Sequence, residues 1–283
     1  MIFCYLCSSK RFKIMRHKLI LILLPCLSLL GGCGEYSRVM KSKDINYKFE
    51  YAKKAYAEGR YVQSSTILTD LITPLKGGPN GEEALYLLGM SYYGNKDFLN
   101  SGVYLKSYYS RYPKGKYAED ARFYCGYGYY LDSPDPQLDQ TETVKGIEEL
   151  QGFLDYYPKS DHTAAAQSAI FELQDKLTLK ELQNALLYYN LGTYMGNNYQ
   201  SAVIVAENAL KTYPYTKYRE DLEMLKLKAK YQEARQSVDE KKVERFRDVI
   251  DEYYSFTNNF PDTENRKEAD NILKIAKRYV NDR

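Results

Sequence analysis

Apolar residues recur at intervals of three and four along most of the chain, and short polar segments separate the runs that carry them. This spacing predicts amphipathic helices, because residues three and four apart lie on one helical face. The clearest predicted pair of helices covers residues 86–93 and 98–111, with a polar turn at residues 95–97. Pro113 ends the second helix, because proline cannot continue the hydrogen-bond ladder. Alternating strand patterns are scarce, so the sequence predicts an all-α fold.

The same helix pair recurs, and its marker is an aromatic residue followed by proline at the end of the second helix. The copies of this marker are Tyr112-Pro113, Tyr157-Pro158, Tyr213-Pro214 and Phe260-Pro261, followed two residues later by Gly115, Ser160, Thr216 and Thr263. A further copy, in which the proline is shifted, begins at Phe49 and has its turn before Tyr61. Pairs of about 34 residues with this layout are typical of tetratricopeptide repeats. The sequence therefore predicts an α-solenoid of about five tetratricopeptide helix pairs.

The turn positions divide the chain into predicted units. Their bounds are about 45–80, 81–116, 117–161, 162–216 and 217–283. The third unit carries an insertion at residues 132–142, whose prolines and aspartates predict a surface loop. Residues 162–195 contain no proline, and no glycine before Gly192, which predicts one long or kinked helix. The tail from residue 262 is predicted to form a capping helix with one apolar face.

The N-terminal segment has the layout of an export signal. Residues 1–32 carry a basic stretch and then an apolar run that is too short to span a bilayer as a helix. Met15 is the predicted translation start. Leu30-Gly-Gly-Cys33 resembles the bacterial lipobox, in which small residues let a peptidase reach the bond and the cysteine thiol is acylated. An ordinary secretory signal is the alternative.

We therefore expect residues 33–44 to be a lipidated, polar tether. The expected modification is a diacylglycerol and an acyl (palmitate) chain on Cys33, and no cofactor is expected. Such an anchor holds a protein on a membrane that the protein does not span, because several acyl chains make the association stable.

The formal net charge of +3 comes from the N-terminal segment. Residues 1–32 hold five Lys or Arg residues and no acidic residue, so the remainder has 35 basic and 37 acidic side chains. A nearly neutral chain has no basic surface of the kind that attracts nucleic acid, and we expect no nucleic-acid partner.

Side chains with catalytic chemistry are scarce after residue 32. His162 is the one histidine there, and it sits at a predicted helix start, where surface or capping roles are typical. No group of residues has the spacing of a metal site, a nucleophile elbow or a phosphate loop. Cys125 is left without a cysteine partner once Cys33 is acylated, and it fits a small core position. We therefore expect neither an enzyme nor a metal site.

The first helices of the N-terminal units carry aromatic residues at positions expected on a binding face. In tetratricopeptide repeats the first helices line a concave groove, and rings there suit an extended or helical peptide because they give contact area at low entropic cost. Packing against the neighbouring helix is the alternative role of each ring. The predicted groove residues are Phe49, Tyr56, Tyr86, Tyr93, Phe123, Tyr127 and Tyr130.

Four features together resemble the BamD family of tetratricopeptide-repeat lipoproteins, also called YfiO or ComL. They are the lipobox, five repeats without another domain, the insertion ahead of residues 146–151, and the long helix running into residues 187–194. The insertion is the most specific of the four. The resemblance covers essentially the whole mature chain. It implies a lipoprotein subunit of the outer-membrane β-barrel assembly (BAM) complex, anchored in the outer membrane and facing the periplasm.

The same resemblance implies the partners. The C-terminal repeats would dock the periplasmic domains of a BamA-like barrel subunit within the assembly complex, and the N-terminal groove would receive unfolded outer-membrane proteins. Two other classes stay open. One is a different periplasmic repeat scaffold of the cell envelope, and the other is a SusD-type glycan-binding lipoprotein, whose relatives are much longer chains.

Overall fold

The computed structural model describes residues 34–281, and every regular element among them is a helix, which confirms the predicted all-α fold. The chain divides into two compact units, the first ending at Tyr124 and the second beginning at Cys125. The division falls within helix α6, in the third predicted repeat.

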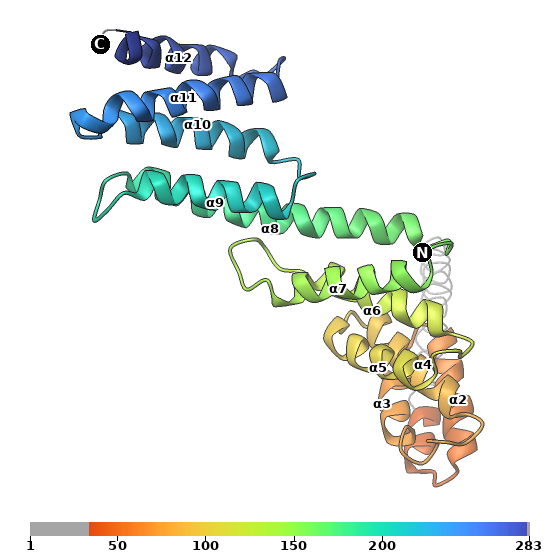
Figure 1. Cartoon of the computed structure of the whole chain (residues 1–283). Helices are drawn as coiled ribbons and strands as arrows, with labels where there is room; N and C mark the ends of the chain where they lie inside the picture. The colour runs from red at the N-terminus through yellow and green to blue at the C-terminus, as the bar shows by residue number, and fades with distance from the viewer. Residues whose placement is uncertain (1–33, 282–283) are drawn as a thin grey trace, which may run out of the picture. The chain divides into compact units, whose positions relative to one another are not determined.

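The first unit consists of short helices joined in pairs by tight turns (Figure 1). It contains a helix at residues 34–41, α2 (Ile45–Ala57), α3 (Tyr61–Leu71), α4 (Gly81–Gly94), α5 (Phe98–Arg111) and the start of α6 (Ala118–Asp132).

The second unit continues the same alternation with longer helices. It contains the end of α6, then α7 (Thr141–Tyr156), α8 (Thr163–Leu191), α9 (Asn198–Thr212), α10 (Arg219–Arg235), α11 (Asp239–Asn259) and α12 (Arg266–Asn281). Figure 1 shows α8 to α12 lying side by side, each antiparallel to the next. The last helix buries Ile272 and Ala276 against α10 and α11, as a capping helix should.

Polar side chains cap the start of two of the second helices, α5 and α9. The Asp97 carboxylate accepts a hydrogen bond from the backbone N–H of Asn100 at 3.2 Å, and the Asn197 side chain accepts one from Gln200 at 3.4 Å. Both bonds satisfy a donor that the first turn of a helix leaves without a partner. The two turns are thus equivalent, although they lie in different units.

In two helix pairs, a glycine on the first helix faces a leucine on the second helix and lets the two helices approach closely. A Cβ atom built on Gly89 of α4 would lie 2.6 Å from the Leu105 side chain of α5. A Cβ atom on Gly126 of α6 would lie 2.8 Å from the Leu150 side chain of α7. No side chain larger than hydrogen fits at either position without displacing its neighbour, which explains the glycines in these two first helices.

The residues after three of the four aromatic–proline markers are held by a carboxylate from an earlier helix. The Glu82 Oε1 atom accepts hydrogen bonds from the Tyr108 hydroxyl at 2.7 Å and from the Lys116 backbone N–H at 2.9 Å. Asp175 Oδ1 accepts from the Thr216 hydroxyl at 2.7 Å and from the Lys217 backbone N–H at 3.1 Å. Both carboxylates therefore fix the start of the next repeat, and we call them junction carboxylates.

A third such carboxylate is Glu220, which accepts hydrogen bonds from the Thr263 hydroxyl and from the Asn265 side-chain amide. The threonines after the markers are therefore hydrogen-bond donors to the preceding repeat. The corresponding Gly115 leaves room for Glu82, because an added Cβ would lie 2.5 Å from Glu82 Oε1.

Helix α8 is a single helix of 29 residues, as the absence of proline and internal glycine predicted. Its first half packs against α7, where Leu173 approaches Gly146. Its second half packs against α9 and α10 through a core that includes Leu182 and Ala185. One continuous helix therefore belongs to two neighbouring repeats and joins them rigidly within the second unit.

The prediction of a polar tether over residues 33–44 is corrected by the structure, because residues 34–41 are helical. Val39 is fully buried in the core of the first unit. The Tyr36 ring lies 6.3 Å from that of Tyr51, between centroids. The i, i+3 spacing of Tyr36 and Val39 gives this short segment an apolar face, which the charges between them obscure in the sequence.

The predicted export signal and the lipidation site Cys33 lie outside the described residues, so both stay predictions. Across residues 34–281, no helix has both the length and the hydropathy needed to cross a membrane.

We expect Gly89→Leu to lower the free energy of unfolding by about 1–3 kcal/mol, because the new side chain overlaps Leu105 in a packed core. Thermal unfolding followed by circular dichroism measures the change. Gly34→Leu is the control, because no atom lies within 4 Å of its added Cβ. Equal melting temperatures for the two variants would contradict the packing described for α4 and α5.

We expect Glu82→Ala to cost about 1–3 kcal/mol, because it leaves the buried Tyr108 hydroxyl and a backbone N–H without their acceptor. Glu83→Ala is the matched control, since the neighbouring carboxylate accepts neither of these bonds. Urea unfolding of both variants gives the comparison. A Glu82→Ala midpoint as high as that of Glu83→Ala would show that the junction carboxylate does not stabilise the repeat.

Candidate binding surfaces

Tyrosines from four helices gather on the first unit. The Tyr56 ring of α2 meets Tyr61 of α3 edge to face at 5.7 Å, and the Tyr93 ring of α4 meets Tyr124 of α6 at 5.0 Å. Tyr86 of α4 stacks on Tyr117, which comes directly before α6. We call these six tyrosines the aromatic cluster: Tyr56, Tyr61, Tyr86, Tyr93, Tyr117 and Tyr124.

Burial and the nearby Asp120 raise the pKa of two hydroxyl groups of this cluster. Burial, followed by the neighbouring Tyr61, Tyr124 and Asp120, raises the pKa of Tyr56. Burial, followed by Asp120, raises the pKa of Tyr86 strongly. The Tyr56 and Tyr86 hydroxyl groups therefore stay protonated at physiological pH, which suits contact with apolar and hydrogen-bonding groups of a peptide.

The predicted groove residues divide into exposed and buried ones. Tyr56 and Tyr93 are partly exposed and belong to the aromatic cluster. Tyr86 is 9% exposed, and its ring stacks on Tyr117 at 4.2 Å. Phe49 and Phe123 are 1% and 4% exposed, so both side chains serve the core of the first unit rather than its surface. These two phenylalanines therefore have the alternative role, which is packing against neighbouring helices.

The remaining two predicted groove residues lie in the second unit. The Tyr127 and Tyr130 rings are 5.1 Å apart, and both are partly exposed. The Tyr130 hydroxyl donates to Glu172 of α8 at 2.6 Å, and this bond raises the pKa of Tyr130 to about 12. The Tyr130 hydroxyl therefore links α6 to α8, and the ring of Tyr130 stays partly exposed.

Tyr117 and Tyr124 were missed as cluster members. Their spacing in the sequence could have indicated this, because Tyr117, Asp120 and Tyr124 are spaced i, i+3 and i+7 and such residues share one helical face. That face of α6 points towards α4, where Tyr86 stacks on Tyr117 and Tyr93 meets Tyr124.

A second apolar surface lies at the turn between α8 and α9. Met195 is 90% exposed and has a backbone φ of +56°, a left-handed conformation that is unfavourable for a residue with a side chain. Tyr194 and Leu187 are exposed as well. The Asn197 amide donates to Glu233 of α10 at 2.8 Å, which holds this turn against the next helix pair. The turn thus presents a methionine and a tyrosine on a supported backbone.

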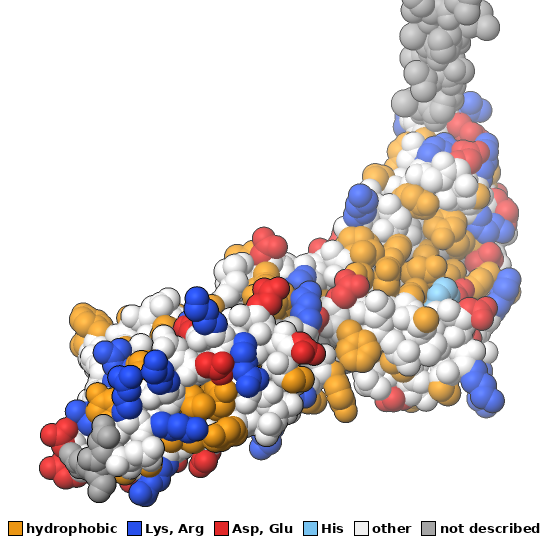
Figure 2. All heavy atoms as spheres, turned by 90° about the horizontal axis from the view of Figure 1, so that it is seen from above, with side chains coloured by type: hydrophobic (Ala, Val, Ile, Leu, Met, Phe, Trp, Pro, Cys, Tyr) orange, Lys and Arg blue, Asp and Glu red, His pale blue; other side chains and the backbone are white. Residues whose placement is uncertain are grey.

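Within residues 34–281, no three His, Cys, Asp or Glu side chains are placed to hold a metal ion. His162 occupies the residue before α8, and Cys125 is buried in α6. On the face drawn in Figure 2, acidic and basic side chains are interspersed with hydrophobic ones. The aromatic and apolar clusters are therefore the more distinctive features of the surface.

Comparison with solved structures gives only a weak similarity. Two crystal structures of nearly identical TPR-like repeats from a candidate kinesin light chain of Podosopora anserina match with a TM-score of 0.32 and 13% identity. The matches cover 83% and 84% of this chain, and 93% and 97% of those chains.

Comparison with protein families gives a direct result. The model of the YfiO family, described as outer membrane lipoprotein, matches residues 41–196, which is more than half of the chain. A candidate outer membrane protein assembly factor BamD of Aquifex aeolicus (strain VF5) is 26% identical over 177 residues. That match covers 62% of this chain and 58% of the relative's length. The resemblance found in the sequence is thereby confirmed, and the chain belongs to the YfiO family of outer membrane lipoproteins.

Proposed function

We propose that this protein is a lipid-anchored, non-catalytic subunit of an outer-membrane β-barrel assembly complex. The family match over residues 41–196 carries the proposal, and the outer membrane assembly factor named among the relatives supports it. The protein would sit on the periplasmic face of the outer membrane, held by acyl chains on Cys33. The all-helical repeat fold, which works elsewhere as a binding scaffold, is consistent with this role.

The aromatic cluster is the proposed site for unfolded outer-membrane proteins. Tyr56 and Tyr93 are partly exposed, while the 9% exposed Tyr86 is packed and stacks on the partly exposed Tyr117. Rings held in place by their neighbours lose little entropy when a peptide binds. An unfolded barrel segment alternates apolar and polar residues, so it offers both the side chains and the backbone groups that such a surface can contact.

The turn between α8 and α9 is the proposed docking surface for a BamA-like barrel subunit. Its support is the exposure of Leu187, Tyr194 and Met195 on a backbone that is fixed against α10. Aromatic and methionine side chains are enriched in the cores of protein interfaces.

We expect Tyr93→Ala to weaken the binding of a synthetic peptide from the C-terminal strand of an outer-membrane barrel protein by about tenfold, as the loss of one ring contact would. Fluorescence anisotropy of the labelled peptide measures the affinity. Tyr47→Ala is the control, because Tyr47 is an exposed tyrosine of α2 outside the cluster. Equal affinities for both variants, or equal binding of a scrambled peptide, would contradict the proposed site.

We expect Cys33→Ala to release the protein from the membrane fraction without changing its melting temperature, because the acyl chains lie outside the folded repeats. Fractionation of cells that express the variant, followed by immunoblotting, measures the distribution. Retention of the unacylated variant in the outer membrane would mean that the anchor is not this cysteine.

A further inference from the structure

The second unit contains a cavity of 420 Å³ between the insertion loop, α8 and the start of α10. Its apolar lining comes from the end of α6, the loop, α8 and the residue that precedes α10. The residues that provide it are Leu131, Pro136, Leu173, Leu179 and the ring of Tyr218. A cavity of this volume lies within the range of small-ligand sites and can hold one large side chain of a partner.

The loop that forms one wall is ordered by buried hydrogen bonds. The Gln140 side chain is 8% exposed, and its amide donates to the carbonyl groups of Asp135 at 2.8 Å and Leu138 at 3.2 Å. The Thr143 hydroxyl donates to the side-chain oxygen Oε1 of Gln140 at 2.8 Å. The insertion therefore has one defined shape, which means that the cavity is preformed.

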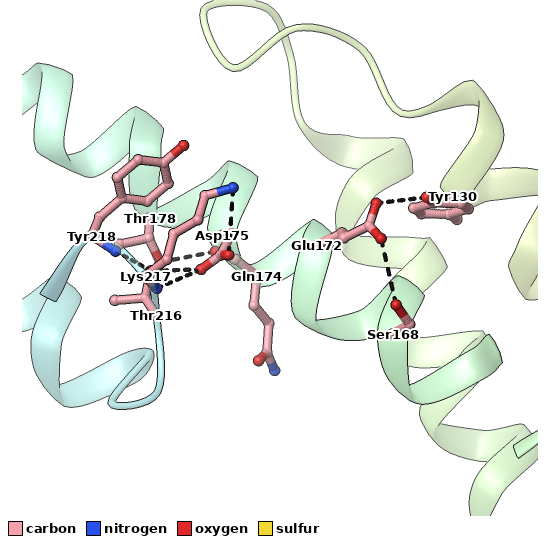
Figure 3. A network of polar contacts seen from close by, with 9 residues as sticks. All are labelled: Tyr130, Ser168, Glu172, Gln174, Asp175, Thr178, Thr216, Lys217 and Tyr218. Atoms are coloured by element: carbon pink, nitrogen blue, oxygen red, sulfur yellow. Dashed lines mark hydrogen bonds and ion pairs between the residues drawn. The ribbon is translucent and has the colours of Figure 1, made fainter. Parts of the chain in front are cut away.

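The carboxylates at the cavity are already occupied by donors from the protein (Figure 3). Glu172 accepts from the Tyr130 hydroxyl at 2.6 Å. Asp175 accepts from the Thr216 hydroxyl and from the Lys217 backbone N–H, and the Lys217 Nζ atom lies 3.7 Å from Asp175 Oδ2. Both acids thus stabilise the fold, and they have little capacity left for a ligand.

The lysines at the cavity have more capacity. The Lys176 amine donates to the Ser133 carbonyl at 2.9 Å and to the Ser133 hydroxyl at 2.7 Å, so an uncharged residue takes two of its three hydrogen bonds. Lys180, one turn further along α8 and outside the cavity lining, donates to the Leu138 carbonyl at 3.1 Å. The Lys217 side chain is 65% exposed, and its amine lies 3.7 Å from an Asp175 carboxylate oxygen and 5.2 Å from the centroid of the Tyr218 ring. Burial lowers the pKa of Lys176, and a bound carboxylate would reverse that effect.

We propose that this cavity binds a partner segment in which a large apolar side chain is flanked by a carboxylate. The apolar side chain would contact Leu131, Leu179 and Tyr218, because Leu173 is only 1% exposed, and the carboxylate would lie between Lys176 and Lys217. The apolar contact supplies most of the binding energy, and the charge pair selects acidic segments over basic ones. The site is separate from the aromatic cluster and does not depend on the role proposed for that cluster.

The test uses a fluorescein-labelled peptide of sequence Gly-Ser-Asp-Phe-Asp-Ser-Gly and two matched peptides, in which Asn or Lys replaces both Asp residues. We expect the Asp peptide to bind the full chain at least about tenfold more tightly than either matched peptide, measured by fluorescence anisotropy. No binding of the Asp peptide at millimolar concentration, or equal binding of the Asn peptide, would overturn the proposal.

Two lysine variants locate the site. Lys217→Gln keeps the backbone bond to Asp175 and should weaken binding of the Asp peptide by about fivefold to tenfold. Lys211→Gln, on an exposed position of α9, is the matched control and should bind as the unaltered protein does. Equal affinities for the two variants would overturn the site. Circular dichroism melting of both variants shows that each is folded, and Tyr93→Ala should leave the affinity for this peptide unchanged.

Discussion

Each helix pair of this chain leaves an apolar face that only the next pair can cover, and the rest of the structure depends on that constraint. Glycine opposite leucine brings the two helices of a pair close enough to form one thin layer, as at Gly89 and Leu105. The junction carboxylates then fix where the next layer starts. A partly buried carboxylate that has lost its donors is costly, so these bonds define the spacing between layers as well as adding stability.

This arrangement explains which aromatic residues are available for binding. A ring on a first helix can point into its own pair, as Phe49 does, or towards the neighbouring layer, as Tyr86 does. Rings at the edge of the contact between layers, such as Tyr56 and Tyr93, keep part of their surface exposed. The abundance of tyrosine therefore reflects packing first, and a smaller set is left for partners.

The helix boundaries could be predicted because proline, glycine and the turn residues act locally. The aromatic–proline markers and the absence of breakers before Gly192 needed no knowledge of tertiary contacts. The buried role of Phe49 and Phe123 could not be predicted, because residues on one helical stripe differ in exposure according to the neighbouring layer. The helix at residues 34–41 was missed because its apolar face is short and lies among charged residues.

The cavity in the second unit was beyond sequence reasoning for a different reason. The insertion at residues 132–142 was recognised as a loop, but its shape depends on Gln140 and on Lys176, which lies 43 residues after Ser133. Contacts at that separation have no local pattern. The predicted lipid anchor is the opposite case, because its prediction rests on four consecutive residues ending at Cys33, which lies outside the described residues.

The central claim is that the protein acts as a subunit of an outer-membrane barrel assembly complex, and co-purification tests it most directly. A tagged full-length chain would be purified from detergent-solubilised outer membranes, and the proteins that accompany it would be identified and quantified by mass spectrometry. We predict a barrel protein with periplasmic repeat domains in near-stoichiometric amount. Recovery of the membrane-bound chain without any barrel protein would contradict the claim and would favour another scaffold of the cell envelope.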